Sequence, residues 1–317
     1  MELMTDQRFR KTIKYLRALI FFGLAGLALA TVLYFSLIGY AKLQGPPPLA
    51  VPQSTLFFSD DGTVIGESHS GQKRYWVALK DISPHLINAT ISIEDKTFFT
   101  HNGFDYKRIA GAALADIKAM AKVQGASTIT QQYARNLYLE HDKTWKRKAT
   151  EALYTFRLEM NYSKDEILEG YLNTIYYGNG AYGVQAASTY YFGKDAKDLS
   201  LAEASMLAGI PKGPSIYSPF ASMEKAKQRQ QTILSTMKAN GYITELYAQK
   251  ASIEKLELVG EHQHSRIGAA PYFQDAVQNA LKNSLNFDDR TISLGGLRFI
   301  RRLILISRKS LKSRLIK

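Results

Sequence analysis

The sequence predicts a mainly α-helical protein with one transmembrane helix and a short β-hairpin near its N-terminus. A long, uncharged apolar segment indicates the membrane helix. After residue 83, helix-capping residues open a series of runs with helical apolar periodicity. The chain has no alternation of strands and helices, no dinucleotide glycine fingerprint and no P-loop. With 317 residues, 45% of them hydrophobic, it can bury a sizeable core.

The membrane segment is expected at residues 18–41, which carry no charge and exceed the roughly 20 residues that cross a bilayer core. The alternative is a cleaved signal peptide, but its apolar region is typically about 7–15 residues long, and no convincing cleavage site follows Leu43. The charged residues ahead of the span are Arg8, Arg10, Lys11, Lys14 and Arg17 against Glu2 and Asp6. By the positive-inside rule, residues 1–17 are then cytoplasmic, and the chain after Lys42 is extracytoplasmic. We expect a single-pass protein of a bacterial cell membrane.

The formal charge of +13 indicates an anionic partner, such as nucleic acid, phospholipid headgroups or a phosphorylated substrate. The predicted topology disfavours nucleic acid, because most of the basic residues would lie outside the cytoplasm. The sequence has no cysteine, which excludes disulfides and Cys-ligated metals.

A stiff linker, residues 42–54, contains GPPPLAVP and separates the anchor from the outer part of the chain. Residues 54–67, STLFFSDDGTVIGE, place apolar residues on both sides of Asp61-Gly62. This pattern predicts a short β-hairpin at the start of a domain expected to cover residues 55–260.

A helix is expected to begin after Ser83, a favourable N-cap, with Pro84 at its first position. On that helix Ile87, Ile91 and Glu94 recur at i, i+4 and i+7, so the carboxylate of Glu94 falls on the buried stripe. A charge at that position indicates function. The alternative is an ordinary solvated acidic pair at a helix end.

Further helix boundaries follow from local signals. Ser163 with Glu166 and Ser200 with Glu203 have the spacing of capping boxes. Gly193 and a second glycine, at position 241, stand where helices would end.

The segment GASTITQQYARNLY, residues 125–138, predicts a loop followed by a helix. Ser127 is the expected N-cap, and Thr128 with Gln131 can form a capping box. Gln132 and Arg135 remain without a structural explanation. Because helix N-termini bind anions, this segment is a candidate ligand site.

The segment KRKATEA, residues 146–152, places Arg147 four residues and Lys148 three residues before Glu151. The alternative to a functional cluster is a surface ion pair worth only some tenths of a kcal/mol.

Together these segments resemble the peptidoglycan glycosyltransferases, glycosyltransferase family 51, of class A penicillin-binding proteins and monofunctional relatives. EDKTFFTHNG (94–103) resembles the E-D-x-x-F-x-x-H-x-G motif, and GASTITQQ (125–132) the second motif. RKATE (147–151) resembles the third motif and KDEILEGYLN (164–173) the fourth. RQQTILSTM (229–237) is similar to a fifth, looser motif, with Gln at its second position where Arg is common.

The resemblance covers about residues 76–241 and implies a lysozyme-like fold. It implies polymerisation of lipid II, in which the 4-hydroxyl of an acceptor sugar attacks the anomeric carbon of a glycan strand attached to lipid pyrophosphate. Glu94 is the implied general base, and Glu151 the second catalytic carboxylate. The implied substrate-binding residues are Asp95, His101, Ser127, Thr128, Gln131, Gln132, Arg135, Asn136, Arg147 and Lys148.

Among these residues, the cations would stabilise the leaving pyrophosphate, in place of or beside a divalent cation such as Mg²⁺ or Mn²⁺. No metal-ligating residue is assigned. The expected partners are lipid II, the growing glycan strand, the membrane, and cell-wall synthesis or division proteins. Nucleic acid is not expected.

Residues 104–124 form an apolar stripe of Ile109, Ala113, Ile117 and Met120 surrounded by basic residues. The stripe fits either an ordinary core helix or a segment that dips into the outer leaflet of a membrane.

No transpeptidase activity is expected. Ser222, Ser235 and Ser252 each begin an S-x-x-K pattern, but this pattern arises by chance, and no K-T-G or K-S-G triplet occurs. Two other classes of function remain open. A lytic peptidoglycan enzyme would make little use of the polar cluster or the anchor, and the intact carboxylates argue against a non-catalytic wall-assembly scaffold.

Residues 261–297 are expected to begin a connection to a missing transpeptidase domain, because SLGGLRF resembles that connection in the family. Residues 298–317 form a basic tail, which we attribute to a truncated or frameshifted reading frame. Such a tail should not pack on the domain and should be disordered in water or adsorb to anionic membranes. A genuine basic membrane-surface helix is the alternative.

Overall fold

A computed structural model of the chain gives the fold. It describes residues 2–49, 51–59, 62, 64–68, 72–119, 125–138, 144–260, 271–288, 291–292 and 295–300.

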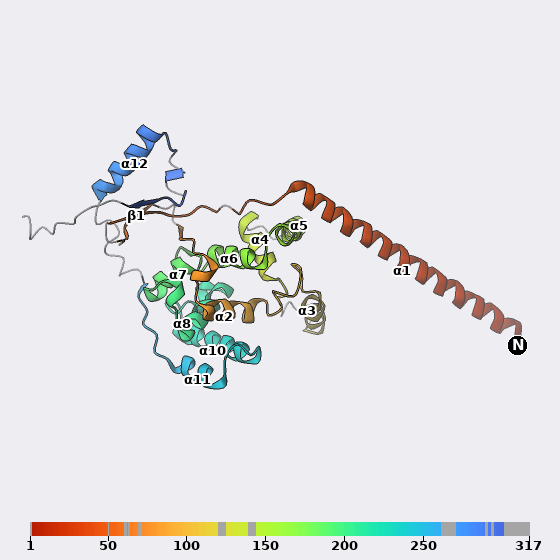
Figure 1. The fold of residues 1–317 in the computed structure, drawn as a ribbon. Coiled ribbons are helices and arrows are strands. Elements are labelled where there is room, and N and C mark those ends of the chain that lie inside the picture. Colours follow the sequence, from red (N-terminus) through yellow and green to blue (C-terminus); the bar gives the residue numbers. More distant parts are fainter. Residues whose placement is uncertain are drawn as a thin grey trace, which may run out of the picture.

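The first helix, α1 (Glu2–Gln44), extends away from the rest of the protein (Figure 1). Its part from Ile13 to Gln44 is long and apolar enough to cross a membrane. The predicted span, residues 18–41, lies inside this part.

The remaining described helices are short, and all but the last of them pack into one helical body, from which the last lies apart (Figure 1). They are α2 (Pro84–Glu94), α3 (Tyr106–Ala119), α4 (Ile129–Tyr138), α5 (Trp145–Asn161), α6 (Lys164–Thr174), α7 (Val184–Phe192), α8 (Leu201–Gly209), α9 (Pro214–Tyr217), α10 (Met223–Ala239), α11 (Glu245–Ile253) and α12 (Pro271–Leu285). Three 3₁₀ turns connect them, η1 (Leu79–Asp81), η2 (Ala196–Asp198) and η3 (Ile210–Lys212). The predicted mainly α class is therefore confirmed. The predicted domain boundaries stay predictions.

The predicted β-hairpin is present. β1 (Thr55–Phe58) pairs antiparallel with β2 (Val64–Ser68). Asp61 of the predicted turn lies outside the described residues, and Gly62 has the positive φ of +78° that favours glycine. A second, two-stranded sheet joins β3 (Lys73–Arg74) in parallel to β4 (Ala181–Tyr182).

The expectation that the tail does not pack on the protein is wrong for its first residues. β5 (Arg298–Ile300) pairs in parallel with β1, opposite β2. The edge of β1 offers unpaired backbone groups to another strand, and Phe299 stacks on Phe57 with ring centroids 5.4 Å apart. α12 lies beside this sheet and buries Phe273 against Phe57 (Figure 1). Residues 301–317 lie outside the described residues.

The predicted helix boundaries depend on local hydrogen bonds, and most are confirmed. Capping boxes form at Ser163 with Glu166 and at Ser200 with Glu203. Ser83 is the N-cap of α2 with Pro84 following, but its hydroxyl donates to the carbonyl of Leu199 instead of capping the helix.

Gly193 ends α7 in the left-handed conformation, and Gly241, with φ of +77°, follows the C-cap of α10.

The core lies where α2 packs against α8 and α10, and where α4 packs against α5 and α6. Its largest fully buried side chains include several tyrosines, among them Tyr133, Tyr171 and Tyr177. Gly170 lets α6 approach α4 closely, since a Cβ atom there would lie 2.1 Å from the hydroxyl of Tyr133. This packing holds the C-terminal end of α2 next to α4 and α10.

The linker after α1 is fixed to the helical body. Arg157 on α5 donates to the carbonyls of Gln44 and Gly45 at 3.2 and 3.1 Å. Tyr162 donates to the carbonyl of Pro47 at 2.7 Å. The end of the predicted membrane anchor is thereby joined to α5, the helix that carries the third motif.

Candidate active site

Glu94 is the last residue of α2, and its side chain is half-buried. Its Oε2 accepts a hydrogen bond from the side-chain amide of Gln132 on α4 at 2.8 Å. The amide oxygen of Gln132 lies 3.4 Å from the hydroxyl of Tyr171, which donates to it. The carboxylate of Glu94 therefore meets α4 through Gln132, which in turn contacts α6 through Tyr171.

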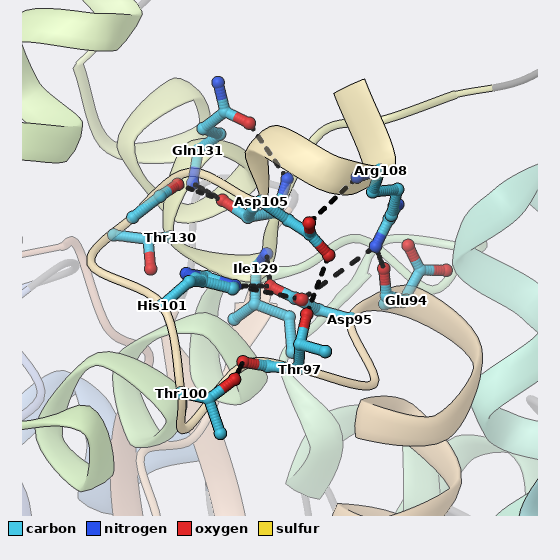
Figure 2. Close-up of polar contacts among 12 residues, drawn as sticks. Glu94, Asp95, Thr97, Thr100, His101, Asp105, Arg108, Ile129, Thr130 and Gln131 are labelled. Carbon is cyan, nitrogen blue, oxygen red and sulfur yellow. Dashed lines mark hydrogen bonds and ion pairs between the residues drawn. The ribbon is translucent and has the colours of Figure 1, made fainter. Parts of the chain in front are cut away.

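Asp95 is the C-cap of α2 and forms the centre of a polar cluster (Figure 2). Its carboxylate is 0% exposed. It accepts hydrogen bonds from His101 Nε2 at 2.9 Å and from the backbone N–H of Ile129 at 3.0 Å. Because these protein groups surround it, Asp95 fixes the loop after α2 to the start of α4. The expectation that Asp95 and His101 bind substrate stays a prediction.

Arg108 on α3 lies between Glu94 and Asp95 (Figure 2). Its guanidinium donates to the backbone carbonyl of Glu94 and, at 3.0 Å, to that of Ser127. It also lies 3.9 Å from the Asp95 carboxylate. Arg108 therefore ties the first and second motifs together.

Asp105 orients the helix that carries Arg108. Its carboxylate accepts hydrogen bonds from the backbone N–H of Arg108 at 2.9 Å and from the Thr97 hydroxyl at 2.7 Å. The first of these bonds contributes most to lowering the pKa of Asp105. Asp105 thus serves as the N-cap of α3.

Thr128, and not Ser127, caps α4. The Gln131 side chain accepts from the Thr128 N–H at 3.0 Å, and the Thr128 hydroxyl oxygen accepts from the Gln131 N–H at 3.2 Å. The Thr128 hydroxyl also donates to the carbonyl of Gly103 at 2.7 Å. This bond to a distant segment favours Thr128 over Ser127 as the N-cap of α4. Both Thr128 and Gln131 are buried, and their contact with substrate stays a prediction.

Glycine is required at position 103 of the first motif. Its φ is +84°, and a Cβ atom there would lie 2.7 Å from Thr155 on α5.

The third motif lies on the first turns of α5. Glu151 is 1% exposed and forms an ion pair with Lys148, whose side chain is partly exposed. Arg147 is half-buried, and within the described residues its buried Nε has no hydrogen-bond partner. A buried carboxylate and a buried guanidinium nitrogen without a partner do not fit a simple surface ion pair.

The end of α4 carries the other two predicted residues. Arg135 is half-buried, and its charge partly opposes the rise in the pKa of Tyr171 that burial and then Glu94 cause. Asn136 is exposed.

The family model "Transglycosylase" matches residues 61–238 of the chain. The chain belongs to the transglycosylase family. This match confirms the predicted resemblance to that family.

Similar proteins are penicillin-binding proteins. The chain is 55% identical over 297 residues to penicillin-binding protein 2D of Bacillus subtilis, covering 94% of this chain and 43% of that protein. It is 37% identical over 257 residues to penicillin-binding protein 1F of the same organism, covering 79% and 35%. A crystal structure of penicillin-binding protein 1A from Haemophilus influenzae is 23% identical, with a TM-score of 0.41 over 79% of this chain and 27% of that chain. The chain spans less than half the length of these relatives.

Four further residues of this transglycosylase chain surround Glu94 or its loop and were not predicted: Arg108, Tyr171, Tyr177 and Arg229. Burial, and then the charge of Glu94, raise the pKa of Tyr171 and of Tyr177.

Arg229 on α10 lies over the ring of Tyr217 at 5.9 Å. Burial lowers its pKa, and the charge of Glu94 opposes this effect. The fifth motif contains Arg229, so the sequence held a signal for it. The next residue, Gln230, is fully buried and donates to the carbonyl of Ala202 at 2.7 Å.

Within the described residues, no group of three or more histidine, aspartate or glutamate side chains is arranged to hold a metal ion. The carboxylates of Glu94, Asp95 and Glu151 have the protein donors Gln132, His101 and Lys148. The donor set therefore does not fit a shared metal site, and the expectation of Mg²⁺ or Mn²⁺ stays a prediction.

Proposed function

We propose that the protein is a peptidoglycan glycosyltransferase that polymerises lipid II into β-1,4-linked glycan strands, with inversion and release of lipid pyrophosphate. The observation that carries the proposal is the half-buried carboxylate of Glu94, held by Gln132 in a chain of the transglycosylase family. The partial coverage of the relatives makes the substrate and the full activity part of the proposal.

Glu94 acts as the general base. Gln132 occupies Oε2, and within the described residues Oε1 has no hydrogen-bond partner, so Oε1 can accept the proton of the acceptor 4-hydroxyl. The oxygen then attacks the anomeric carbon from the face opposite the pyrophosphate. The new C–O bond forms as the bond to pyrophosphate breaks, and the leaving group keeps the electron pair, which gives inversion.

Lys148, Arg147 and Arg135 stabilise the leaving pyrophosphate. Each can place a positive charge near oxygens whose negative charge grows in the transition state. Glu151 is buried and paired with Lys148, so its role is to orient that ammonium group. Ser127 and Asn136, which are partly or fully exposed, can bind sugar or phosphate oxygens.

We propose that α1 crosses the bacterial cell membrane once, with residues 1–17 in the cytoplasm and the helical body outside. The surface of α3 supports a position at the membrane. Tyr106, Leu114 and Ile117 are exposed, and Ala112 is buried, so α3 is not an ordinary core helix. An exposed apolar surface with basic residues is suited to the outer leaflet, where lipid II resides. Cell-wall synthesis or division proteins are proposed partners.

The test is incubation of the detergent-solubilised protein with lipid II. The proposal predicts polymer. Cleavage of preformed glycan without reaction of lipid II would indicate a lytic enzyme, and no reaction with either would indicate a scaffold. Lys148→Met and Arg147→Met should each slow polymerisation about 10²–10³-fold. Lys146→Met, on the same helix turn but exposed, is the matched control and should leave the rate unchanged.

A further inference from the structure

Glu159 on α5 is a buried carboxylate that the proposed reaction does not use. Its side chain is 8% exposed. One of its oxygens, Oε1, accepts a hydrogen bond from the Thr130 hydroxyl on α4 at 2.5 Å. The same oxygen accepts from the ammonium group of Lys164, the first residue of α6, at 2.7 Å. A single carboxylate oxygen therefore joins three helices, α4, α5 and α6.

Glu159 and Lys164 also contact the loop that follows α2. The Lys164 ammonium nitrogen lies 4.6 Å from the ring centroid of Phe98, which is fully buried. A cation over an aromatic face is attracted to the ring. A Cβ atom at Gly103 would lie 3.0 Å from Cγ of Glu159, so the backbone of Gly103 lies directly against that side chain. Both ends of the loop segment from Phe98 to Gly103 are thereby held against the three helices.

The hydrogen bond between Thr130 and Glu159 is a charge-assisted one. Thr130 is 0% exposed, so its hydroxyl depends on a protein acceptor. Bonds from a hydroxyl to a carboxylate are short, about 2.5–2.7 Å, and stronger than bonds between neutral groups. The ammonium group of Lys164 compensates the charge of the buried carboxylate. The side chain of Thr130 is therefore fixed more tightly than packing alone would fix it.

Thr130 lies on the same turn of α4 as Gln132, the residue that holds Glu94. Residues two positions apart on a helix lie about 200° apart around its axis, so their side chains point to nearly opposite sides. Thr130 faces α5, and Gln132 faces Glu94 at the end of α2. Holding Thr130 therefore sets the rotation of this turn about the helix axis, and with it the direction of the Gln132 amide.

We propose that Glu159 is a positioning residue for Glu94. Through Thr130 it orients Gln132, and Gln132 holds the Glu94 carboxylate by the hydrogen bond to Oε2. Glu159 acts without contacting the substrate, and Lys164 balances its charge. The role of Glu94 as the base rests on the proposed function, whereas the path from Glu159 to Gln132 rests on the contacts between α4, α5 and α6 alone.

The first measurement follows the side-chain amide of Gln132 by NMR in the detergent-solubilised full chain, with its signals assigned by Gln132→Met. Thr130→Val keeps the shape of the side chain but removes the hydroxyl, so the Gln132 amide protons should exchange with water about tenfold faster. Thr130→Ser keeps the hydroxyl and should leave the exchange rate near that of the wild type. Glu159→Gln should speed the exchange as Thr130→Val does, so the result does not depend on one variant folding.

The control signal in the same spectra is the indole N–H of Trp76. It donates to Glu169 on α6 at 2.9 Å, outside the path from Glu159 to Gln132. Its exchange rate should not change in any of these variants. A general loosening of the helical body would move this signal together with that of Gln132.

The second measurement is the rate of lipid II polymerisation. Thr130→Val and Glu159→Gln should each lower kcat about tenfold, because a misplaced base slows proton transfer, while KM for lipid II changes by less than about twofold. Thr130→Ser should keep the wild-type rate. Asp165→Asn is the matched control, because it removes the same charge beside Lys164 from an exposed position, and it should also keep the wild-type rate.

The outcomes separate this inference from the proposed function. Unchanged exchange at Gln132, or an equal rise at Trp76, would overturn the positioning role, even if the wild type polymerises lipid II. Faster exchange at Gln132 alone, absent in Thr130→Ser, supports the role, even if the wild type gives no polymer. Where polymer forms, a wild-type kcat in both Thr130→Val and Glu159→Gln would also overturn it.

Discussion

Replacing Asp95 with asparagine should lower the free energy of unfolding by about 3 kcal/mol. The carboxylate is fully buried and accepts from His101 Nε2 at 2.9 Å and from the Ile129 N–H at 3.0 Å, with Arg108 at 3.9 Å. Asparagine has the same shape but one acceptor oxygen, and its NH₂ group must face one of these donors. No water can reach the site to replace the lost acceptor.

The magnitude follows from the loss of one hydrogen bond to a charged group, which contributes about 1.5–3 kcal/mol, and from the buried donor left without a partner. It lies at the lower end of the roughly 3–5 kcal/mol measured for breaking buried charge pairs. The loop after α2 should also loosen, so the polymerisation rate should fall along with stability.

The assay is urea unfolding of the detergent-solubilised protein, followed by far-UV circular dichroism. Asp105→Asn is the matched control, because Asp105 belongs to the same cluster and caps α3, and asparagine caps helices as well as aspartate does. The control should lower the free energy of unfolding by only about 1 kcal/mol, because Asp105 loses its charge and the hydrogen bond that it accepts from the Thr97 hydroxyl. An Asp95→Asn protein as stable as this control would refute the stabilising role of the buried Asp95 carboxylate.

Three further predictions concern packing, pH and the anchor. Gly170→Ala should lower the free energy of unfolding in urea by about 3 kcal/mol, because the new Cβ atom would clash with Tyr133. Tyr133→Phe should leave the free energy of unfolding nearly unchanged, since the buried Tyr133 hydroxyl has no hydrogen-bond partner among the described residues. Equal effects of the two variants would contradict this packing. Burial and the charge of Glu94 raise the pKa of Tyr171 above its value in the unfolded chain, about 10, so the free energy of unfolding should fall as pH rises above 10. Tyr171→Phe should make the fall in urea midpoint between pH 8 and 10.5 less steep. An identical slope in the wild type and the variant would argue against a raised pKa of Tyr171. Arg157→Met should speed protease cleavage of the linker after α1, because it removes the hydrogen bonds from Arg157 to the carbonyls of Gln44 and Gly45. An unchanged cleavage rate would show that these bonds do not restrain the linker.

Much of the fold was predictable because its signals are local. The capping boxes at Ser163 and Ser200 need only residues three positions apart. The half-buried position of Glu94 agrees with the apolar period of one helix. The choice of Thr128 over Ser127 as the N-cap depends on a bond to Gly103, 25 residues away, which no local pattern contains.

The unpredicted parts depend on contacts between distant segments. Arg108 contacts Glu94 only because α3 folds back over the end of α2. Arg229 reaches the surroundings of Glu94 through the packing of α10 on α2. β5 pairs with β1 more than 200 residues earlier, and a short basic segment gives no sign of its strand partner.

The central claim is that Glu94 is the general base of glycan polymerisation. The most direct measurement is the rate of lipid II polymerisation by Glu94→Gln, with circular dichroism and the melting temperature measured on the same sample. If Glu94 is the base, the variant should polymerise about 10²–10⁴-fold more slowly than the wild type while remaining folded, because the glutamine side chain keeps the size of Glu94 but cannot take the proton. A folded Glu94→Gln protein that polymerises lipid II at a rate near the wild type would contradict it.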